Sequence, residues 1–378
     1  MTRKTDKKPH ILFLFSDTGG GHRSAAQAII EALEVYYPNR VTTEMLDFFV
    51  EYAPPPFDMA VTTYAPMAQV PDLWELGYKL SNGKWRSKLV QEVLWPYIHK
   101  AAERLVKEHP CDLFLSVHPI INTPLLRALG DQHDPYVIVI TDMVTTHALW
   151  YNNSATITLA PTEEAKQRGV NIGLDPERIQ VVGQPIADKF RQPPAPKAEL
   201  RKMLGWPQDL PVVLMVGGGE GMGPIEETVR AVDSAQLELV MAIIAGRNDT
   251  LKKSLESADL QTQAMVYGFV DNMSDLMNAA DIIVTKAGPG TISEAFIAGL
   301  PIILYSRMPG QEDGNVDYVV DKRAGVWAPY PEQVVTTLRY WVNNPDIREE
   351  VARTSKSLAR PDASKDIAQK IIETVTQA

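Results

Sequence analysis

The sequence predicts an α/β protein with two doubly wound parallel-sheet domains, and three observations lead to this prediction. First, short continuous apolar runs alternate with helical patterns along almost the whole chain, as in sheets whose strands are joined by crossover helices. Second, the glycine-rich turn after the apolar run 11–15 has a counterpart after the run 211–216. Third, a chain of 378 residues is longer than one domain normally is.

The predicted strands are apolar runs without polar alternation. Such runs favour a parallel sheet, because helices cover both faces of each of its strands. Right-handed crossovers between the strands then give the doubly wound arrangement. In chain order we expect strands at residues 11–15, 113–117, 136–140, 156–159, 179–182, 211–216, 239–244, 265–267, 282–284 and 301–304.

A proline-rich linker divides the chain. Residues 192–197, QPPAPK, contain three prolines in six positions and therefore form a stiff connection rather than a helix or strand. We expect an N-terminal domain over residues 10–190 and a C-terminal domain over residues 198–340. Residues 341–378 are expected to be helical, with a last helix over residues 363–376 that packs back on the N-terminal domain.

Charge and cysteine content exclude several classes of function. The net charge is −10, so no overall field attracts nucleic acid, and an anionic ligand needs a local basic site. The single cysteine, Cys111, can form neither an internal disulfide nor a metal cluster, which fits a reducing cytosol. No apolar stretch reaches 18 residues and no signal-peptide core follows the basic N-terminus, so we expect a cytoplasmic protein that can still associate with a membrane face.

Residues 45–100 do not follow the alternation and are rich in proline and aromatic residues. From Lys79 to Glu108, seven Lys or Arg residues stand against three Glu. Basic residues interleaved with Trp and Tyr are typical of a membrane interface, where the rings lie at headgroup depth. The alternative is that the rings cover the domain core and the basic side chains are solvated. The candidate membrane residues are Trp74, Lys84, Trp85 and Arg86.

The turn SDTGGGHRS, residues 16–24, is the first candidate site. Gly20 and Gly21 permit positive φ and a close approach of a ligand to the backbone. A helix is expected from about Ser24, which places His22 at a helix N-terminus and at the carboxyl end of a strand, where α/β sheets bind ligands. The positive end of the helix is expected to lower the pKa of His22 and to keep its imidazole neutral. The alternative is a tight turn with a solvated histidine.

Two common nucleotide-binding motifs are absent from this first turn. It contains no G-x-x-x-x-G-K-[ST] and no G-x-G-x-x-G. In addition, no acidic residue clearly ends the second strand, where dinucleotide-binding folds place a ribose-binding carboxylate. The turn therefore predicts neither a P-loop nor a dinucleotide site.

The second candidate site is the turn GGGEGMGPIEET, residues 217–228, which has five glycines in its first seven positions. Gly219 and Gly223 are candidates for contact with a phosphate or a sugar. Pro224 suits the first helical position, and Glu226 and Glu227 suit the first turn of a helix. The alternative is an ordinary strand-to-helix turn.

The third candidate site is TKAGPGT, residues 285–291. Gly288 and Gly290 expose backbone N–H groups at a helix N-terminus, which suits a diphosphate, and Lys286 can add positive charge. Glu294 can accept both hydroxyls of a ribose. Alternatively, Glu294 is the capping-box partner of Thr291.

Polar side chains also follow the next predicted strand. Gln311, Glu312 and Asn315 lie after the run 301–304 and offer amide and carboxylate groups that suit sugar hydroxyls. Because the carboxyl ends of parallel strands share one edge of a sheet, we expect them near the third glycine turn.

A family resemblance covers nearly the whole chain. It depends on the combination of SDTGGGHRSAAQAI, SVHPIIN, ITDMVTTHALWY, VVGQPI, GGGEGMGPIEET, NAADIIVTKAGPGTISEA and PGQEDGNVDYV. Together these motifs resemble the GT-B glycosyltransferases, in particular the monogalactosyldiacylglycerol synthase branch of glycosyltransferase family 28. The resemblance implies two Rossmann-like domains facing a cleft, with the nucleotide sugar bound mainly by the C-terminal domain and the acceptor lipid by the N-terminal domain. Since no transit peptide is apparent, a bacterial member is expected.

The resemblance also implies roles for single residues. His22 is the expected base, with Asp142 as the competing candidate, and His118 lies on the acceptor side with Gly20 and Gly21. Alternatively, Asp142 caps a turn and His118 is a packed core residue. Phe269 and Val270 present backbone groups to the uracil. The remaining nucleotide-sugar residues are Gly219, Gly223, Lys286, Gly288, Gly290, Thr291, Glu294, Gln311, Glu312 and Asn315.

The implied reaction is the inverting transfer of galactose or glucose from a UDP-sugar to the hydroxyl of 1,2-diacylglycerol, at the inner face of the cell membrane. No D-x-D occurs, so no metal is expected in the active site, and no other cofactor. Diacylglycerol and a membrane surface are the expected partners, anionic lipids are left open, and nucleic acid is excluded. Three alternatives remain: a UDP-sugar 2-epimerase, a transferase acting on a lipid-linked peptidoglycan precursor, and a nucleotide-sugar sensor without turnover.

Overall fold

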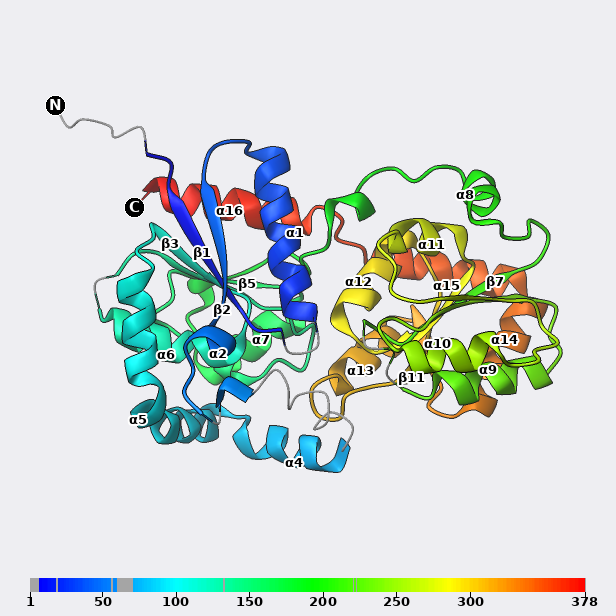
Figure 1. The fold of residues 1–378 in the computed structure, drawn as a ribbon, viewed down its shortest axis with the longest axis horizontal. Coiled ribbons are helices and arrows are strands. Elements are labelled where there is room, and N and C mark those ends of the chain that lie inside the picture. The colour runs from blue at the N-terminus through cyan, green and yellow to red at the C-terminus, as the bar shows by residue number, and fades with distance from the viewer. Residues whose placement is uncertain are drawn as a thin grey trace. The chain divides into compact units, whose positions relative to one another are not determined.

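The computed structural model describes residues 7–17, 20–55, 57–59, 71–131, 133–219, 221 and 223–377. The chain divides into two compact units (Figure 1). The first consists of Met1–Asp188, Pro309–Gln311 and Asp362–Ala378, and the second of Lys189–Met308 and Glu312–Pro361. Each unit contains one six-stranded sheet whose strands are all paired in parallel.

The elements of the first unit alternate from strand to helix as predicted, apart from the region around α4 and α5. In chain order they are β1 (His10–Phe15), α1 (Gly21–Tyr36), β2 (Thr42–Asp47), α2 (Phe48–Glu51), η1 (Phe57–Met59), α4 (Pro71–Ser81), α5 (Lys84–Glu108), β3 (Leu113–Ser116), α6 (Pro119–Leu129), β4 (Tyr136–Val139), η2 (Ala148–Trp150), β5 (Ile157–Ala160), α7 (Glu163–Ile172), η3 (Pro176–Arg178), β6 (Ile179–Val181), η4 (Asp188–Phe190) and, at the end of the chain, α16 (Ala363–Gln377).

The second unit repeats the alternation with longer strands at its centre. Its elements are α8 (Lys197–Leu204), β7 (Val212–Val216), α9 (Ile225–Ser234), β8 (Val240–Ile244), α10 (Asp249–Glu256), β9 (Ala264–Tyr267), α11 (Met273–Ala279), β10 (Ile282–Lys286), α12 (Pro289–Ala298), β11 (Ile302–Ser306), α13 (Asp313–Asp321), β12 (Gly325–Trp327), α14 (Pro331–Asn343) and α15 (Pro345–Ser357).

Successive side chains of β1 explain why its apolar run is continuous. Ile11 and Phe13 point into a core that also contains Ile29 of α1 and Ile367 of α16. Leu12 lies on the opposite face, in a core with residues from α5 and α6. Because helices cover both faces, every position from Ile11 to Phe15 is buried and apolar. The helix α16 thus completes the layer beside α1 in the first unit (Figure 1).

The strand orders place a topological switch point in each sheet. The first sheet runs β2-β1-β3-β4-β5-β6, so the chain passes from β1 out to β2 and then back across to β3, which places the switch point between β1 and β3. The second runs β12-β11-β10-β7-β8-β9, with its switch point between β7 and β10. Ligands of doubly wound sheets bind outside the carboxyl ends of the strands at such points. A ligand-binding site is therefore expected at the turns that follow β1, β3, β7 and β10.

Each predicted strand is confirmed, and the described residues form two further strands that the pattern does not indicate. The first is β2, Thr42–Asp47, an edge strand whose sequence TTEMLD is largely polar because its first four side chains are exposed or partly exposed. The second, β12, has only three residues.

The expectation that no acidic residue ends the second strand is wrong, because Asp47 lies at the end of β2. Its carboxylate accepts hydrogen bonds from backbone N–H groups of Phe49, Val50 and Asp17, so it caps α2 and holds the first glycine turn.

Candidate functional site

The histidine of the first glycine turn lies at the switch point of the first sheet. The helix α1 begins at Gly21 rather than near Ser24, which places His22 inside its first turn. Gly20 caps the helix with φ at 75°, a left-handed conformation that favours glycine. Nδ1 of His22 lies 2.7 Å from the backbone oxygen of Val117 and 3.0 Å from Oγ1 of Thr141.

These contacts fix the tautomer of His22. A carbonyl oxygen can only accept a hydrogen bond, so Nδ1 carries the hydrogen and donates it to Val117. The other ring nitrogen, Nε2, then bears the lone pair. The pKa of His22 is lowered, chiefly because burial penalises the imidazolium, and the negative charge of Asp142 opposes this effect. The predicted direction is thus correct, but burial rather than the helix dipole is its main cause.

A second buried histidine packs against the first. His118 caps the N-terminus of α6 with its backbone and is only 5% exposed. Its ring lies edge-on to the ring of His22, with 4.7 Å between the ring centres. Its Nδ1 has no hydrogen-bond partner within the described part of the chain. Burial lowers its pKa well below the ordinary value, so the ring next to His22 is neutral.

Asp142 follows β4 and is buried, with hydrogen bonds to both carboxylate oxygens. The indole Nε1 of Trp150 donates to Oδ2 at 2.7 Å, and Nε2 of Gln311, which belongs to the first unit, donates to Oδ1 at 3.0 Å. Burial raises the pKa of Asp142, and these hydrogen bonds together with His22 counteract the rise. Each oxygen accepts one of these hydrogen bonds, which stabilise the carboxylate and so oppose its protonation. Asp142 acts on His22 through its charge.

In the second unit, the turn after β10 leads directly into α12. Gly288 caps the helix and Pro289 occupies the first helical position. The backbone N–H groups of Gly290 and Thr291 belong to the first turn, where they have no carbonyl partner within the helix. A side chain at Gly290 would meet no atom within 4 Å, so no neighbouring group packs against this position of the first turn. Such an end suits a phosphate group.

The alternative assignment of Glu294 as a capping-box partner is wrong. The cap is Gly288, so Thr291 is the third residue of α12 and cannot cap it. Glu294 is instead partly buried one turn into the helix, and burial raises the pKa of its carboxyl group to about 7, against a smaller opposing effect of Lys189. Glu294 is therefore a candidate ligand-binding group, because its carboxyl group has a raised pKa and lies one turn after the N–H groups of Gly290 and Thr291.

The polar residues after β11 pack around the same turn. Nζ of Lys286 lies 2.8 Å from Oε1 of the buried Glu312, whose Oε2 accepts a hydrogen bond from the backbone of Met308. Nδ2 of Asn315 donates to the backbone oxygen of Ala287 at 2.8 Å. Its buried Oδ1 has no partner among the described residues. These contacts hold the 285–291 turn in place. Oδ1 of Asn315 is the amide oxygen that remains able to accept a hydrogen bond.

The second glycine turn packs closely on its neighbours. A side chain at Gly221 would come within 2.1 Å of the backbone oxygen of Ala245, so part of the glycine content is explained by close backbone packing. Gly219 accepts a hydrogen bond from the backbone of Arg247, and Gly223 has φ at 95°. Pro224 is the cap of α9 rather than its first residue, because the helix begins at Ile225.

Phe269 and Val270 follow β9, at the carboxyl edge of the second sheet. The ring of Phe269 is 62% exposed, and the guanidinium of Arg247 lies 4.6 Å from its centre. Val270 is partly buried beside it.

The candidate membrane residues differ in how accessible they are. Trp85 is 78% exposed, and Lys84 and Arg86 are exposed beside it at the start of α5. Trp74 is partly buried instead, and its indole nitrogen is enclosed. Three leucines of α4, Leu73, Leu76 and Leu80, face solvent instead, which the sequence pattern did not indicate. No helix in the described part of the chain is both long and apolar enough to cross a membrane.

Several residues that shape the site have no signal in the sequence. Val117 contributes only a backbone oxygen, and any residue type offers the same group. Thr141 and Trp150 lie in the motif ITDMVTTHALWY but contact His22 and Asp142 only because β4 and η2 fold back to the switch point. Only the tertiary structure reveals such partners.

Comparison with solved structures identifies the class of this fold. Staphylococcus aureus MnaA with UDP superposes with a TM-score of 0.64 at 14% identity, covering 98% of both chains. Acinetobacter baumannii MurG gives 0.62 at 16%, covering 98% of this chain and 100% of that one. Anabaena HepE in complex with UDP and glucose gives 0.56 at 15%, again covering 98% and 100%. With two doubly wound parallel sheets, the protein has the GT-B fold.

Sequence comparison then identifies the family. Residues 22–186 match the family described as monogalactosyldiacylglycerol (MGDG) synthase, and residues 212–368 match the glycosyltransferase family 28 C-terminal domain. A probable monogalactosyldiacylglycerol synthase of Nicotiana tabacum is 36% identical over 380 residues, which are 97% of this chain and 71% of that protein. Monogalactosyldiacylglycerol synthase 2 of Arabidopsis thaliana is 34% identical over 380 residues, 97% and 81% of the two chains. The chain belongs to the monogalactosyldiacylglycerol synthase family.

Proposed function

We propose that this protein is an inverting UDP-hexose:1,2-diacylglycerol 3-β-glycosyltransferase that makes a glycosyldiacylglycerol. The names of its relatives favour galactose as the hexose. The fold likeness to a UDP-GlcNAc 2-epimerase of Neisseria meningitidis, with a TM-score of 0.62 at 15% identity, does not favour epimerisation. It reflects the fold alone, whereas the sequence relatives are synthases that match over nearly the whole chain.

The second unit is proposed to bind the donor. The exposed N–H groups of Gly290 and Thr291 receive the diphosphate, and the positive end of α12 stabilises the charge that develops on UDP as it leaves. Glu294 accepts the ribose hydroxyls. Lys286 is paired with Glu312 and therefore contributes a partly neutralised charge. Gly219, Gly223, Phe269, Val270, Gln311, Glu312 and Asn315 remain proposed contacts of the nucleotide sugar.

The first unit is proposed to activate the acceptor at His22. Nε2 takes the proton of the diacylglycerol hydroxyl, the freed oxygen attacks the anomeric carbon, and the bond from that carbon to the phosphate oxygen breaks. The hydrogen bond from Nδ1 to Val117 stabilises the imidazolium that results, as does the charge of Asp142. His118, Gly20 and Gly21 line the approach to this nitrogen. A pKa below 6.5 keeps Nε2 free to accept a proton at neutral pH.

The acceptor lies in a bilayer, so the first unit is also proposed to bind a membrane surface, with the enzyme peripheral on the cytoplasmic face. Seven large apolar side chains on α4 and α5 are each 54% to 78% exposed. Their helical spacing places them on one face of each helix. We call them the α4–α5 surface: Leu73, Leu76, Leu80, Trp85, Leu89, Val93 and Tyr97.

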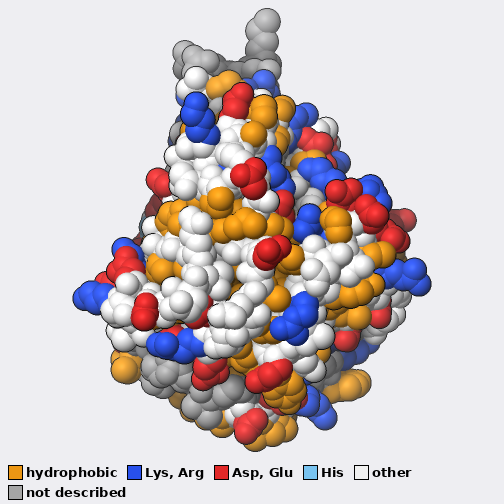
Figure 2. All heavy atoms as spheres, turned by 90° about the vertical axis from the view of Figure 1, so that its right-hand side faces the viewer, with side chains coloured by type: hydrophobic (Ala, Val, Ile, Leu, Met, Phe, Trp, Pro, Cys, Tyr) orange, Lys and Arg blue, Asp and Glu red, His pale blue; other side chains and the backbone are white. Residues whose placement is uncertain are grey.

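Basic residues flank the α4–α5 surface. Lys84, Arg86, Lys88 and Lys100 are exposed on α5, and Nζ of Lys88 lies 5.7 Å from the ring centre of Trp85. A cluster of exposed apolar side chains with basic neighbours is typical of a surface that enters the headgroup region of a bilayer. Elsewhere the charges are mixed: the face drawn in Figure 2 intersperses both signs with scattered apolar side chains, without one basic field.

The observation that carries the proposal is the 2.7 Å contact between Nδ1 of His22 and the Val117 carbonyl, because it leaves a lone pair on Nε2 of a partly buried, neutral imidazole. The test is to offer radiolabelled UDP-galactose and UDP-glucose with diacylglycerol vesicles and to separate the lipid products by chromatography. Label in a monohexosyl lipid supports the proposal. Epimerised UDP-sugar without a lipid product, or UDP binding with no product, would refute it.

A further inference from the structure

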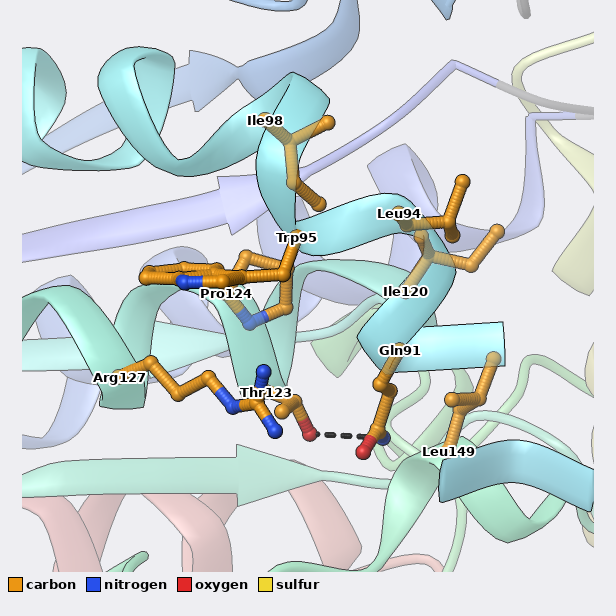
Figure 3. A pocket seen from close by; sticks show the side chains of 9 residues that line it. All are labelled: Gln91, Leu94, Trp95, Ile98, Ile120, Thr123, Pro124, Arg127 and Leu149. Carbon is orange, nitrogen blue, oxygen red and sulfur yellow. Dashed lines mark hydrogen bonds between the residues drawn. The ribbon is translucent and has the colours of Figure 1, made fainter. Parts of the chain in front are cut away.

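A hollow between α5 and α6 lies next to the proposed acceptor site. Its apolar walls are Leu94, Trp95 and Ile98 of α5, Ile120 and Pro124 of α6, and Leu149 of η2. We call it the α5–α6 slot, and Figure 3 shows these side chains facing one another across it.

The polar groups of the slot are occupied by one another. Nε2 of Gln91 donates to Oγ1 of Thr123 at 2.8 Å, drawn as a dashed line in Figure 3, and Nδ2 of Asn152 donates to the same oxygen at 3.1 Å. At the other end, Arg127 forms an ion pair with Glu92. An occupant of the slot therefore gains from apolar contact and needs no hydrogen-bonding group.

The guanidinium of Arg127 also closes one side of the slot, since it lies 5.5 Å from the ring centre of Trp95. The hollow amounts to about 280 Å³ including its open mouth. This volume counts solvent-filled space at the mouth, so the enclosed part of the slot is much smaller and has room only for a narrow group such as a short stretch of hydrocarbon.

The slot adjoins the reacting groups along the chain. Ile120 lies two residues after His118, and Leu149 directly precedes Trp150, whose indole binds Asp142. The helix that forms one wall, α5, also carries the exposed residues from Trp85 to Tyr97 of the α4–α5 surface. A ligand that reaches His22 from a bilayer at this surface has the slot beside its path.

We propose that the α5–α6 slot holds a segment of one acyl chain of the acceptor diacylglycerol while its hydroxyl lies at His22. This inference rests on the proposed function and adds to it a binding site for the lipid tail. The apolar walls, the absence of unsatisfied polar groups in the lining named above and the position beside His118 and Trp150 all fit a hydrocarbon chain joined to a reacting hydroxyl.

Kinetics with water-soluble acceptors test the slot through turnover. Dibutanoyl and dihexanoyl glycerol differ by two methylenes per chain, and each methylene buried from water changes affinity about fourfold. If one chain enters the slot, KM falls about fifteenfold from the shorter to the longer acceptor. Ile120→Phe fills the slot and should reduce this ratio to below about threefold. The matched control is Ile347→Phe on α15, since both isoleucines are 38% exposed.

Fluorescence gives a readout that does not need turnover. Diacylglycerol brominated in mid-chain, in phosphatidylcholine vesicles, should quench Trp95, so the wild type loses more fluorescence than Trp95→Phe does. Ile120→Phe should abolish this difference, and Ile347→Phe should preserve it. Equal quenching of the wild type and Trp95→Phe would overturn the slot even if transfer to diacylglycerol occurs. Quenching of Trp95 without any lipid product would instead refute the proposed function and leave the slot standing.

Discussion

The carboxyl group of Glu294 links donor binding to the stability of the second unit. Burial raises its pKa from an ordinary value of 4.5 to about 7, so its ionised form is disfavoured in the folded protein. Above pH 7 the folded state must carry a poorly solvated carboxylate, whereas the unfolded state has already ionised at lower pH. The unfolded state therefore binds fewer protons between these two values, and stability falls as pH rises through this window.

The size of the effect follows from the raised pKa. At about 1.36 kcal/mol for each pH unit, the ionised Glu294 costs about 3 kcal/mol of unfolding free energy at pH 8 at most, and less than about 1 kcal/mol at pH 5. Glu294→Gln keeps the side chain neutral and similar in size. It should therefore raise the melting temperature of the second unit by up to about 6–12 °C at pH 8, and by little at pH 5.

The same substitution should weaken donor binding, because a charged acceptor of two ribose hydroxyls is lost. We expect at least about a tenfold rise in the KM for the UDP-sugar. Differential scanning calorimetry at pH 5, 6, 7 and 8 with donor kinetics measures both effects, and Glu332→Gln, at an exposed position of α14, is the control. A stabilisation that is equal at pH 5 and pH 8 would refute the burial argument. An unchanged KM would refute the ribose role.

Four further predictions concern the first unit. His22→Gln should lower kcat by at least about a hundredfold, the contribution of one general base, and a loss below about tenfold would remove His22 from the mechanism. In the wild type, kcat should fall on the acid side with an apparent pKa below 6.5, since base catalysis needs neutral imidazole. Asp142→Asn removes a charge that raises the pKa of His22, so this acid limb should move to lower pH; an upward shift or no shift in the pH–rate profile would contradict the assignment. Changing Trp85 and Leu89 together to serine should reduce co-sedimentation with anionic vesicles at least about tenfold, whereas Tyr340→Ser, at a residue 53% exposed on α14, should not; undiminished binding would count against the α4–α5 surface.

The parts of the fold that the sequence predicts are those governed by burial. A strand such as β7, Val212–Val216, is apolar at each position because both faces are covered, so the run itself marks the strand. The edge strand β2 escapes detection because its first residues are partly exposed and polar. Because this strand was not predicted, the role of Asp47 at its end was not predicted either. The Asp47 carboxylate caps α2 and accepts a hydrogen bond from the first glycine turn.

The candidate site shows a similar division. Glycine turns at the carboxyl ends of strands could be found from the pattern, since few residues tolerate the backbone of Gly20. Whether Glu294 caps a helix or faces a ligand could not be decided, because the choice depends on where α12 begins. The exposure of the tryptophan side chains could not be predicted from the sequence either. Trp74 and Trp85 both lie in the aromatic and basic segment, but only Trp85 faces solvent.

The most direct test is a crystal structure of the protein with bound UDP. We expect the diphosphate against the backbone N–H groups of Gly290 and Thr291, with the ribose hydroxyls on Glu294. UDP bound elsewhere, with the N-terminus of α12 empty, would contradict this expectation.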